Sequence, residues 1–238
     1  MNGNKRITRK SLVTSVALML FLSVFAASAG AAWTDWRSSY ATYTGSGYSG
    51  GNALLDPIPS TMKITALNPM DYNYMGIKAA LAGAYLEVQG PKGKTVVYVT
   101  DQYPEGAPGA LDLSPNAFAK IGDMKAGKIN IKWRVVKGPV KGNFTYRIKE
   151  GSSQWWAAIQ VRNHKYPVLK LEVYKDKRWI SLEKTEYNHF VGTGLGTAKL
   201  KVRITDIRGK SVTDTIQALP ANGTSTAYLV PGSVQLPD

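Results

Sequence analysis

Residues 128–136 read KINIKWRVV, and apolar side chains occupy every second position from Ile129 to Val135. Successive side chains of a β-strand point to opposite faces, so this alternation predicts a strand with one buried face. Upstream, residues 84–88 and 95–100 flank the turn Pro91-Lys-Gly-Lys94, which is typical of a β-hairpin. We therefore predict a mostly β protein.

Helices are expected to be few and short. Asn68-Pro69 and Ser114-Pro115 each place a capping side chain before a proline at the first helical position, and the second pair introduces residues 116–121. Beyond an interruption by Pro and Gly at residues 137–143, short strands recur at residues 155–161, 168–174, 178–182, 199–205 and 211–216. Several short strands at this spacing predict a β-sandwich of roughly 95 residues.

The N-terminus has the composition of a secretory signal peptide. Its basic region contains Lys5, Arg6, Arg9 and Lys10, an uncharged apolar stretch follows, and Ala27-Ser-Ala29 offers a cleavage site. We predict a signal peptide over residues 1–29, with the cut uncertain by a few residues. A first domain over 33–137, a linker at 138–142 and a second domain over 143–238 complete the division. The protein is then secreted, extracellular and cell-wall associated, without a membrane anchor.

Composition narrows the function classes. The chain has no cysteine and two histidines, which argues against a cysteine nucleophile or a structural zinc site, so no metal or cofactor is expected. Subtracting the four basic residues of the leader from the formal net charge of +14 leaves +10, which favours polyanions. Outside a cell these are acidic wall polymers such as pectin, teichoic acid or peptidoglycan. Export argues against nucleic acid.

One strand carries this charge on a single predicted face. In residues 199–204, Leu200, Val202 and Ile204 alternate with Lys199, Lys201 and Arg203. The three basic residues are candidates for polyanion binding. The alternative is an ordinary solvated strand face.

Residues 100–115 hold the candidate carboxylates. Asp101 and Asp112 lie near predicted strand ends with Tyr103 between them, and two converging carboxylates are the usual apparatus of glycoside hydrolysis. Both could equally be structural residues of turns and helix entries. The glycine-rich segment 42–51 contains a G-x-S-x-G pattern, but no helix start follows it, which disfavours a serine hydrolase. It is better read as a loop that brings backbone close to a sugar, or as a plain mobile loop.

Trp155 and Trp156 are adjacent aromatic residues at a predicted strand. On a regular strand they would point to opposite faces, one into the core. If the strand begins late or bulges, both can lie on one face and form a platform for sugar rings. Tyr187, in polar surroundings, could extend that platform.

These residues together resemble the bacterial expansins, and the resemblance covers essentially the whole chain after the predicted leader. It rests on segments in the same order at residues 41–51, 55–59, 98–101, 109–118, 129–134, 143–148, 155–166 and 206–209. The resemblance implies a double-psi β-barrel related to glycoside hydrolase family 45, followed by an immunoglobulin-like β-sandwich that binds cellulose.

The resemblance also implies roles for single residues. Asp112 matches the proton donor of the related hydrolases, and Thr42, Asp101 and Tyr103 match the groove around it. The hydrolytic base has no evident match, so the chain is expected not to be an enzyme but to loosen cell walls without hydrolysis. An inverting hydrolase without its base cannot activate water.

In the second domain, the resemblance implies an aromatic strip for cellulose and other β-glucans, formed by Trp155, Trp156 and Tyr187 and assisted by Lys149. A monomer is expected. Two alternatives stay open, a weak glycan-cleaving enzyme of the endoglucanase or lytic transglycosylase type, and a pure polysaccharide-targeting module.

Overall fold

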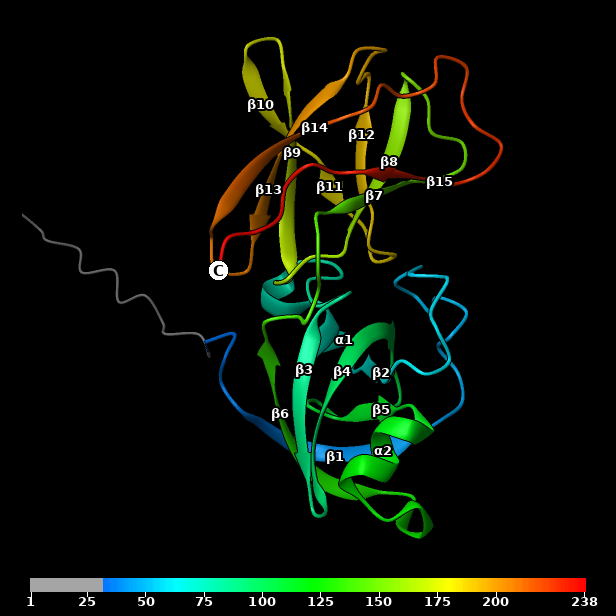
Figure 1. The fold of residues 1–238 in the computed structure, drawn as a ribbon, viewed down its shortest axis with the longest axis vertical. Helices are drawn as coiled ribbons and strands as arrows, with labels where there is room; N and C mark the ends of the chain where they lie inside the picture. The colour runs from blue at the N-terminus through cyan, green and yellow to red at the C-terminus, as the bar shows by residue number, and fades with distance from the viewer. Residues whose placement is uncertain (1–31) are drawn as a thin grey trace, which may run out of the picture. The chain divides into compact units, whose positions relative to one another are not determined.

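The computed structural model describes residues 32–238, which form one compact unit. The predicted signal peptide, residues 1–29, lies outside the described residues. Within the described part, the chain folds as a double-psi β-barrel followed by an immunoglobulin-like β-sandwich (Figure 1). The predicted fold class, mostly β, is therefore confirmed.

Six strands close the barrel in the order β1-β5-β2-β4-β3-β6. They are β1 (Arg37–Tyr43), β2 (Ile64–Leu67), β3 (Tyr85–Gly90), β4 (Gly93–Gln102), β5 (Leu111–Leu113) and β6 (Ile129–Val136). β1 runs parallel to β5 and β2 runs parallel to β4, whereas the other neighbours are antiparallel. A closed barrel has no free sheet edge, so each strand has a partner on both sides.

The alternation in residues 128–136 is realised in β6. Ile129, Ile131, Trp133 and Val135 are buried in the barrel, while Asn130 and Lys132 are exposed. The predicted hairpin is also confirmed, because β3 pairs with β4 across the turn at residues 91–92. Both of its strands are longer than predicted, since the twisted barrel extends the ladder to Gly90 and Gly93.

The helices are short, as predicted: α1 (Pro69–Tyr72), η1 (Tyr74–Gly76), α2 (Pro115–Ile121) and η2 (Met124–Ala126). Asn68 caps α1, because its side chain accepts a hydrogen bond from Met70 N. The predicted side-chain cap at Ser114 is wrong. Ser114 Oγ instead accepts a hydrogen bond from Ile64 N at 3.0 Å, so this hydroxyl ties β2 to the helix start. Over residues 32–238, no helix is long and apolar enough to cross a membrane.

The sandwich consists of two antiparallel sheets. The first has the order β10-β9-β13-β14 and contains β9 (Val168–Lys175), β10 (Arg178–Ser181), β13 (Leu200–Asp206) and β14 (Ser211–Ile216). The second has the order β11-β12-β8-β7-β15 and contains β7 (Thr145–Ile148), β8 (Trp156–Arg162), β11 (Glu183–Lys184), β12 (Phe190–Thr193) and β15 (Tyr228–Pro231). The five strands singled out in this half are confirmed to within one or two residues. β7, β11, β12 and β15 were not predicted, because strands of two to four residues carry little alternation; β10, also of four residues, was nevertheless predicted.

The stretch between the two architectures contains the predicted linker. β6 ends at Val136 and β7 begins at Thr145, and no residue between them belongs to a strand. Side chains of β8 nevertheless donate hydrogen bonds to the barrel loop at residues 53–56. Gln160 Nε2 donates to the carbonyl of Ala53 at 2.8 Å, and the Arg162 guanidinium donates to the carbonyls of Leu54 and Asp56. The division into 33–137, 138–142 and 143–238 stays a prediction.

Candidate functional site

The barrel brings together the groove residues implied by the family resemblance. Strand register places Thr42 of β1 opposite Asp112 of β5, Asp112 opposite Ala66 of β2, and Ala66 opposite Asp101 of β4. The flanking residues Leu111 and Leu113 are fully buried in the core. Because side chains alternate along a strand, Asp112 points away from that core. Thr42, Asp112 and Asp101 therefore share one row across the barrel. The small Ala66 lies between the two carboxylates.

The groups around Asp112 have opposing effects on its pKa. Thr42 Oγ1 donates a hydrogen bond to Asp112 Oδ1 at 2.7 Å, and the Tyr103 hydroxyl lies 3.4 Å from Thr42 Oγ1. The pKa of Asp112 is nevertheless raised above its ordinary value, first by burial and then by the negative charges of Glu105 and Asp101. A carboxyl group with a raised pKa is suited to donate a proton or a hydrogen bond.

Asp101 is held by backbone groups. Its Oδ1 accepts hydrogen bonds from Asn52 N and Gln102 N, both at 2.8 Å. The neighbouring Gly51 has a φ of +55°, and a Cβ there would lie 2.4 Å from the carbonyl oxygen of Thr100 and 2.8 Å from Asp101 Cγ. Only glycine fits this position. The glycine-rich segment thus brings its backbone close to Asp101; its predicted contact with a sugar stays a prediction.

The loop after β4 holds Tyr103 and a residue that the sequence interpretation passed over. A Cβ at Gly106 would lie 2.5 Å from the Tyr103 ring, so this glycine lets the loop fold closely over the ring. Glu105, in the same loop, contributes negative charge at Asp112. In the sequence, only the position of Glu105 two residues after Tyr103, within residues 100–115, could have indicated this role. A third carboxylate therefore belongs to the surroundings of the groove.

The strip residues lie on the sandwich. Trp155 is 71% exposed and immediately precedes β8, so strand alternation does not force the two indoles onto opposite faces. Trp156 is the first residue of β8 and pairs with Thr193 of β12. Tyr187 lies in the turn between β11 and β12, and its ring stacks obliquely on His189 with centroids 5.3 Å apart. Lys149 follows β7 and forms an ion pair with Glu150.

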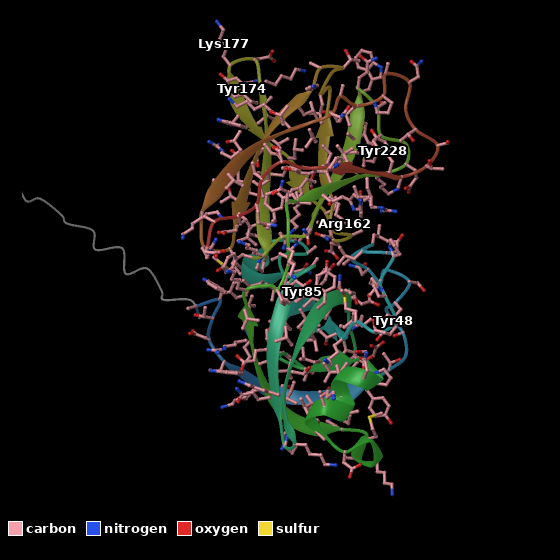
Figure 2. The ribbon with its side chains drawn as sticks, in the orientation of Figure 1. Tyr48, Tyr85, Arg162, Tyr174, Lys177 and Tyr228 are labelled. Atoms are coloured by element: carbon pink, nitrogen blue, oxygen red, sulfur yellow. The ribbon has the colours of Figure 1, made fainter. Side chains whose placement is uncertain are left out.

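The turn that carries Tyr187 is hydrogen-bonded to barrel residues that support the groove. The carbonyl of Glu186 accepts hydrogen bonds from Asn52 Nδ2 at 2.8 Å and from the Tyr72 hydroxyl at 3.3 Å. Asn52 is the residue whose backbone N–H holds Asp101. Arg162, labelled in Figure 2, adds its bonds from β8 to the same loop. The groove and the strip are therefore linked through residues 51–56.

The predicted basic face of β13 is partly neutralised by its neighbour. Arg203 donates from Nε and Nη2 to the two carboxylate oxygens of Glu172, both at 2.7 Å, and Lys170 forms a third contact at 2.8 Å. These cations lower the pKa of Glu172 to about 2. Lys201 lies 5.4 Å from the ring of Tyr174, which Figure 2 labels on β9, and it forms no ion pair with another described residue. Lys199 precedes the strand, so Lys201 is the strand residue of this basic face whose charge is left available.

A metal-dependent arrangement is not found in the part of the chain that is described. Residues 32–238 contain no group of three or more His, Asp or Glu side chains arranged to hold an ion.

A double-psi barrel with a carboxylate groove, followed by an immunoglobulin-like sandwich, places the chain in the class of barrel-plus-sandwich β proteins. The chain belongs to the expansin family. It is 70% identical to Expansin-YoaJ of Bacillus subtilis over 231 residues, which is 96% of this chain and 100% of that protein. Expansin-like protein 1 of Dictyostelium discoideum is 25% identical and is matched over 84% of this chain and 73% of its own length. No protein-family model matches the chain.

Solved structures agree with this assignment. A point mutant of Clavibacter michiganensis expansin, in complex with cellohexaose, superposes with a TM-score of 0.74 at 29% identity, over 84% of this chain and 98% of that one. Apo Clavibacter michiganensis expansin superposes with a TM-score of 0.73 at 30% identity and the same coverage. Both the barrel and the sandwich are thus shared with expansins.

Proposed function

We propose that this expansin is a secreted, non-hydrolytic protein that binds cellulose and loosens cell walls by disrupting non-covalent contacts between polysaccharide chains. One observation carries the proposal. Asp112 has a raised pKa and no cationic partner within residues 32–238, whereas Asp101 is held by two backbone N–H groups. A protonated Asp112 can donate a hydrogen bond to a sugar oxygen, while Asp101 is oriented toward the loop backbone. The groove then has a donor without an oriented hydrolytic base.

Binding is assigned to the sandwich. Trp155, Trp156 and Tyr187 offer apolar rings for stacking on glucose units, and Lys149 lies beside them in sequence. Each aromatic contact contributes about 1 kcal/mol beyond the burial of its apolar surface, so three together add about 3 kcal/mol to the hydrophobic burial of the rings. The Clavibacter expansin complex with cellohexaose supports a β-glucan as the ligand.

Loosening is assigned to the barrel. A glucan chain docked on the strip would bring a neighbouring chain to the groove formed by Thr42, Asp101, Tyr103 and Asp112. Hydroxyl and carboxyl groups there can replace hydrogen bonds that the chain made to its neighbours in the wall. The bonds from residues 52–56 to β8 and to Glu186 support coordinated use of the two regions.

The proposal extends to the protein's location, oligomeric state, charged partners and domain bounds. The protein acts as a monomer outside the cell. Lys199 and Lys201 add salt-sensitive contacts to acidic wall polymers such as pectin, teichoic acid or peptidoglycan, whereas Arg203, paired with Glu172, adds a weaker one. The barrel corresponds to residues 33–137 and the sandwich to residues 143–238.

A weak glycan-cleaving activity is the second candidate. Glu105, in the loop after β4, contributes negative charge at Asp112 and is a carboxylate besides Asp101 that could act as a base. In that case Asp112 would protonate the leaving oxygen while Glu105 would activate water.

The deciding experiment measures two quantities on one preparation. Heat-inactivated plant wall strips are extended under constant load while soluble sugar is assayed in the bathing solution. Extension without sugar release supports loosening. Sugar release that follows extension and disappears in Glu105→Gln would show that the protein is a hydrolase.

The same assay separates loosening from simple targeting. If Asp112→Asn loses extension but keeps cellulose binding, the barrel has its own role. Unchanged extension in this variant would leave only the targeting module.

A further inference from the structure

The barrel has an open hollow that lies outside the residues assigned above. Its volume is ≈ 820 Å³, and it is formed by β1, β3 and β6, which Figure 1 shows as neighbours. Among the described residues that line it, none is acidic. The lining side chains used below are Ser38, Tyr40, Gln89, Lys128, Asn130 and Lys132.

Strand register explains why these side chains gather. Lys132 of β6 pairs with Ser38 of β1 on one side and with Gln89 of β3 on the other, and Asn130 pairs with Tyr40. Ile129 and Ile131, which alternate with these residues along β6, are buried. The hollow is therefore the polar outer surface of a rigid three-strand segment and not a loop surface.

Its two lysines are positioned by aromatic rings. Lys128 Nζ lies 3.6 Å from the centroid of the Tyr40 ring, and Lys132 Nζ lies 5.0 Å from that of Trp36, which is 37% exposed. Neither lysine forms an ion pair with another described residue. A ring attracts a cation without neutralising its charge, so both ammonium groups stay available to an anion.

Arg134 differs from these two lysines because its charge is paired with a carboxylate. Arg134, two residues along β6, also lies over Trp36, at 4.6 Å, but it donates to Glu87 Oε2 at 2.7 Å from Nη2 and 3.0 Å from Nε. Glu87 lies at the rim of the hollow: its Oε1 accepts a hydrogen bond from Gln89 Nε2 at 3.4 Å and lies 3.6 Å from Lys94 Nζ. Its carboxylate is thus engaged by Arg134, Gln89 and Lys94 and by neither Lys128 nor Lys132.

From this arrangement we infer that the hollow binds an acidic, carboxylate-bearing linear polysaccharide. The two ammonium groups are available for carboxylates, and their residues are separated by roughly 13 Å of extended chain. Ser38, Asn130 and Gln89 lie between or beside them and can exchange hydrogen bonds with sugar hydroxyls. This site is separate from the basic face of the sandwich and from the aromatic strip.

The hollow adjoins the groove. Tyr40 and Thr42 lie on the same face of β1, two residues apart. The Tyr40 hydroxyl also accepts a hydrogen bond from Ala107 N at 3.2 Å, in the loop that carries Tyr103 and Glu105. An acidic chain bound in the hollow therefore lies beside the groove, and the protein can hold an acidic polymer and a neutral glucan at the same time.

The test compares two doubly substituted full-length proteins that lose the same charge. Lys128→Gln/Lys132→Gln removes both cations of the hollow. Lys120→Gln/Lys141→Gln is the control, because both of its lysines are exposed and form no ion pair with a described residue. Affinity for unesterified polygalacturonate is measured at low salt by affinity electrophoresis, with fully methyl-esterified polymer and cellulose in parallel, and thermal unfolding verifies folding.

We expect the first variant to bind unesterified polygalacturonate about five- to tenfold more weakly, and the control to stay within about twofold of the parent protein. Methyl-esterified polymer and cellulose should bind both variants equally. Equal affinity of the two variants for the unesterified polymer would overturn the inference. So would an equal loss on the esterified polymer, because charge would then not be what the hollow recognises.

Discussion

The groove and the outer face of the four-stranded sheet each contain a carboxylate that is partly or fully buried, but the neighbours of these two carboxylates carry opposite charge. Glu172 lies between Arg203 and Lys170, and its pKa is lowered to about 2. Asp112 has a hydroxyl partner, Thr42, and two negatively charged neighbours, and its pKa is raised. Cations thus stabilise the ionised form of Glu172, whereas burial and negative neighbours disfavour the ionised form of Asp112.

The difference separates structural from functional polar groups. Ionised Glu172 contributes to folding, because two cations compensate its desolvation. Asp112 contributes nothing comparable, since its neighbours disfavour the charged form. A residue that costs stability in this way is a candidate for function. Three experiments test whether the two carboxylates differ in this respect, and a fourth tests the loop that packs on Asp101 beside the groove.

Asp112→Asn should have the largest effect, a near-complete loss of wall extension. The amide can still accept the hydrogen bond from Thr42 and keeps an N–H donor, but it cannot ionise and is a much weaker donor to a sugar oxygen than a carboxylic acid. The folded protein should be as stable as the parent or slightly more stable at neutral pH, because a disfavoured charge is removed. Constant-load extension and thermal unfolding provide the two readouts. Asp176→Asn, in the exposed turn after β9, is the matched control, and an equal loss of extension there would contradict the role of Asp112.

Gly51→Ala should destabilise the protein by about 2–4 kcal/mol. The new methyl group would meet the Thr100 carbonyl at 2.4 Å, at a φ of +55° that disfavours any side chain. Urea unfolding gives the free-energy change. Gly45→Ala is the control because a Cβ there meets nothing within 4 Å, and its change should stay within about 0.5 kcal/mol. Equal effects would mean that the loop does not pack on Asp101 as described.

Glu172→Gln should lower the free energy of unfolding at neutral pH by about 1–2 kcal/mol, because two cations lose their charged partner. The folded state of the parent binds fewer protons at Glu172 than the unfolded state between pH 4.5 and about 2. The contribution of Glu172 is therefore present above this window and is lost as the pH falls through it. The variant should lack this part of the acid dependence in unfolding titrations. Glu183→Gln, at an exposed ion pair with Lys78, should change stability by less than about 0.5 kcal/mol.

Glu105→Gln should have the smallest effect, a shift in the pH profile of extension. Removal of this negative charge lowers the pKa of Asp112 toward its ordinary value, so a function that depends on protonated Asp112 would fail at a lower pH than in the parent. Extension is measured as a function of pH at constant ionic strength. An unchanged profile would show that Glu105 does not act on Asp112.

Much of the fold was accessible from local pattern. Alternation identified β6, the β3–β4 hairpin and β13, because each of these strands has one face in a core. The barrel topology came from the family resemblance and not from the pattern, since parallel pairing of β1 with β5 joins residues that are far apart in the sequence, such as Thr42 and Asp112. The cap at Ser114 failed for a similar reason, because a distant strand, β2, takes up the hydroxyl.

The candidate groove was named residue by residue, but its electrostatics were not. Thr42, Asp101, Tyr103 and Asp112 could be matched to a family pattern, whereas Glu105 matched none and became visible only through its charge at Asp112. The basic row of β13 was predicted correctly as an alternating strand. Its neutralisation by Glu172 depends on the pairing of β9 with β13, which no local pattern encodes.

Side-chain periodicity and an ordered set of motifs along the chain are enough to identify a mostly β protein of the expansin family. Which charges lie close together depends on the fold: Asp112 with Glu105, Arg203 with Glu172, and Lys128 and Lys132 with aromatic rings and with no carboxylate of the described residues. The physical reason is that electrostatic energy depends on distance in space, and strand register in a closed barrel or a sandwich sets that distance between residues far apart in the sequence.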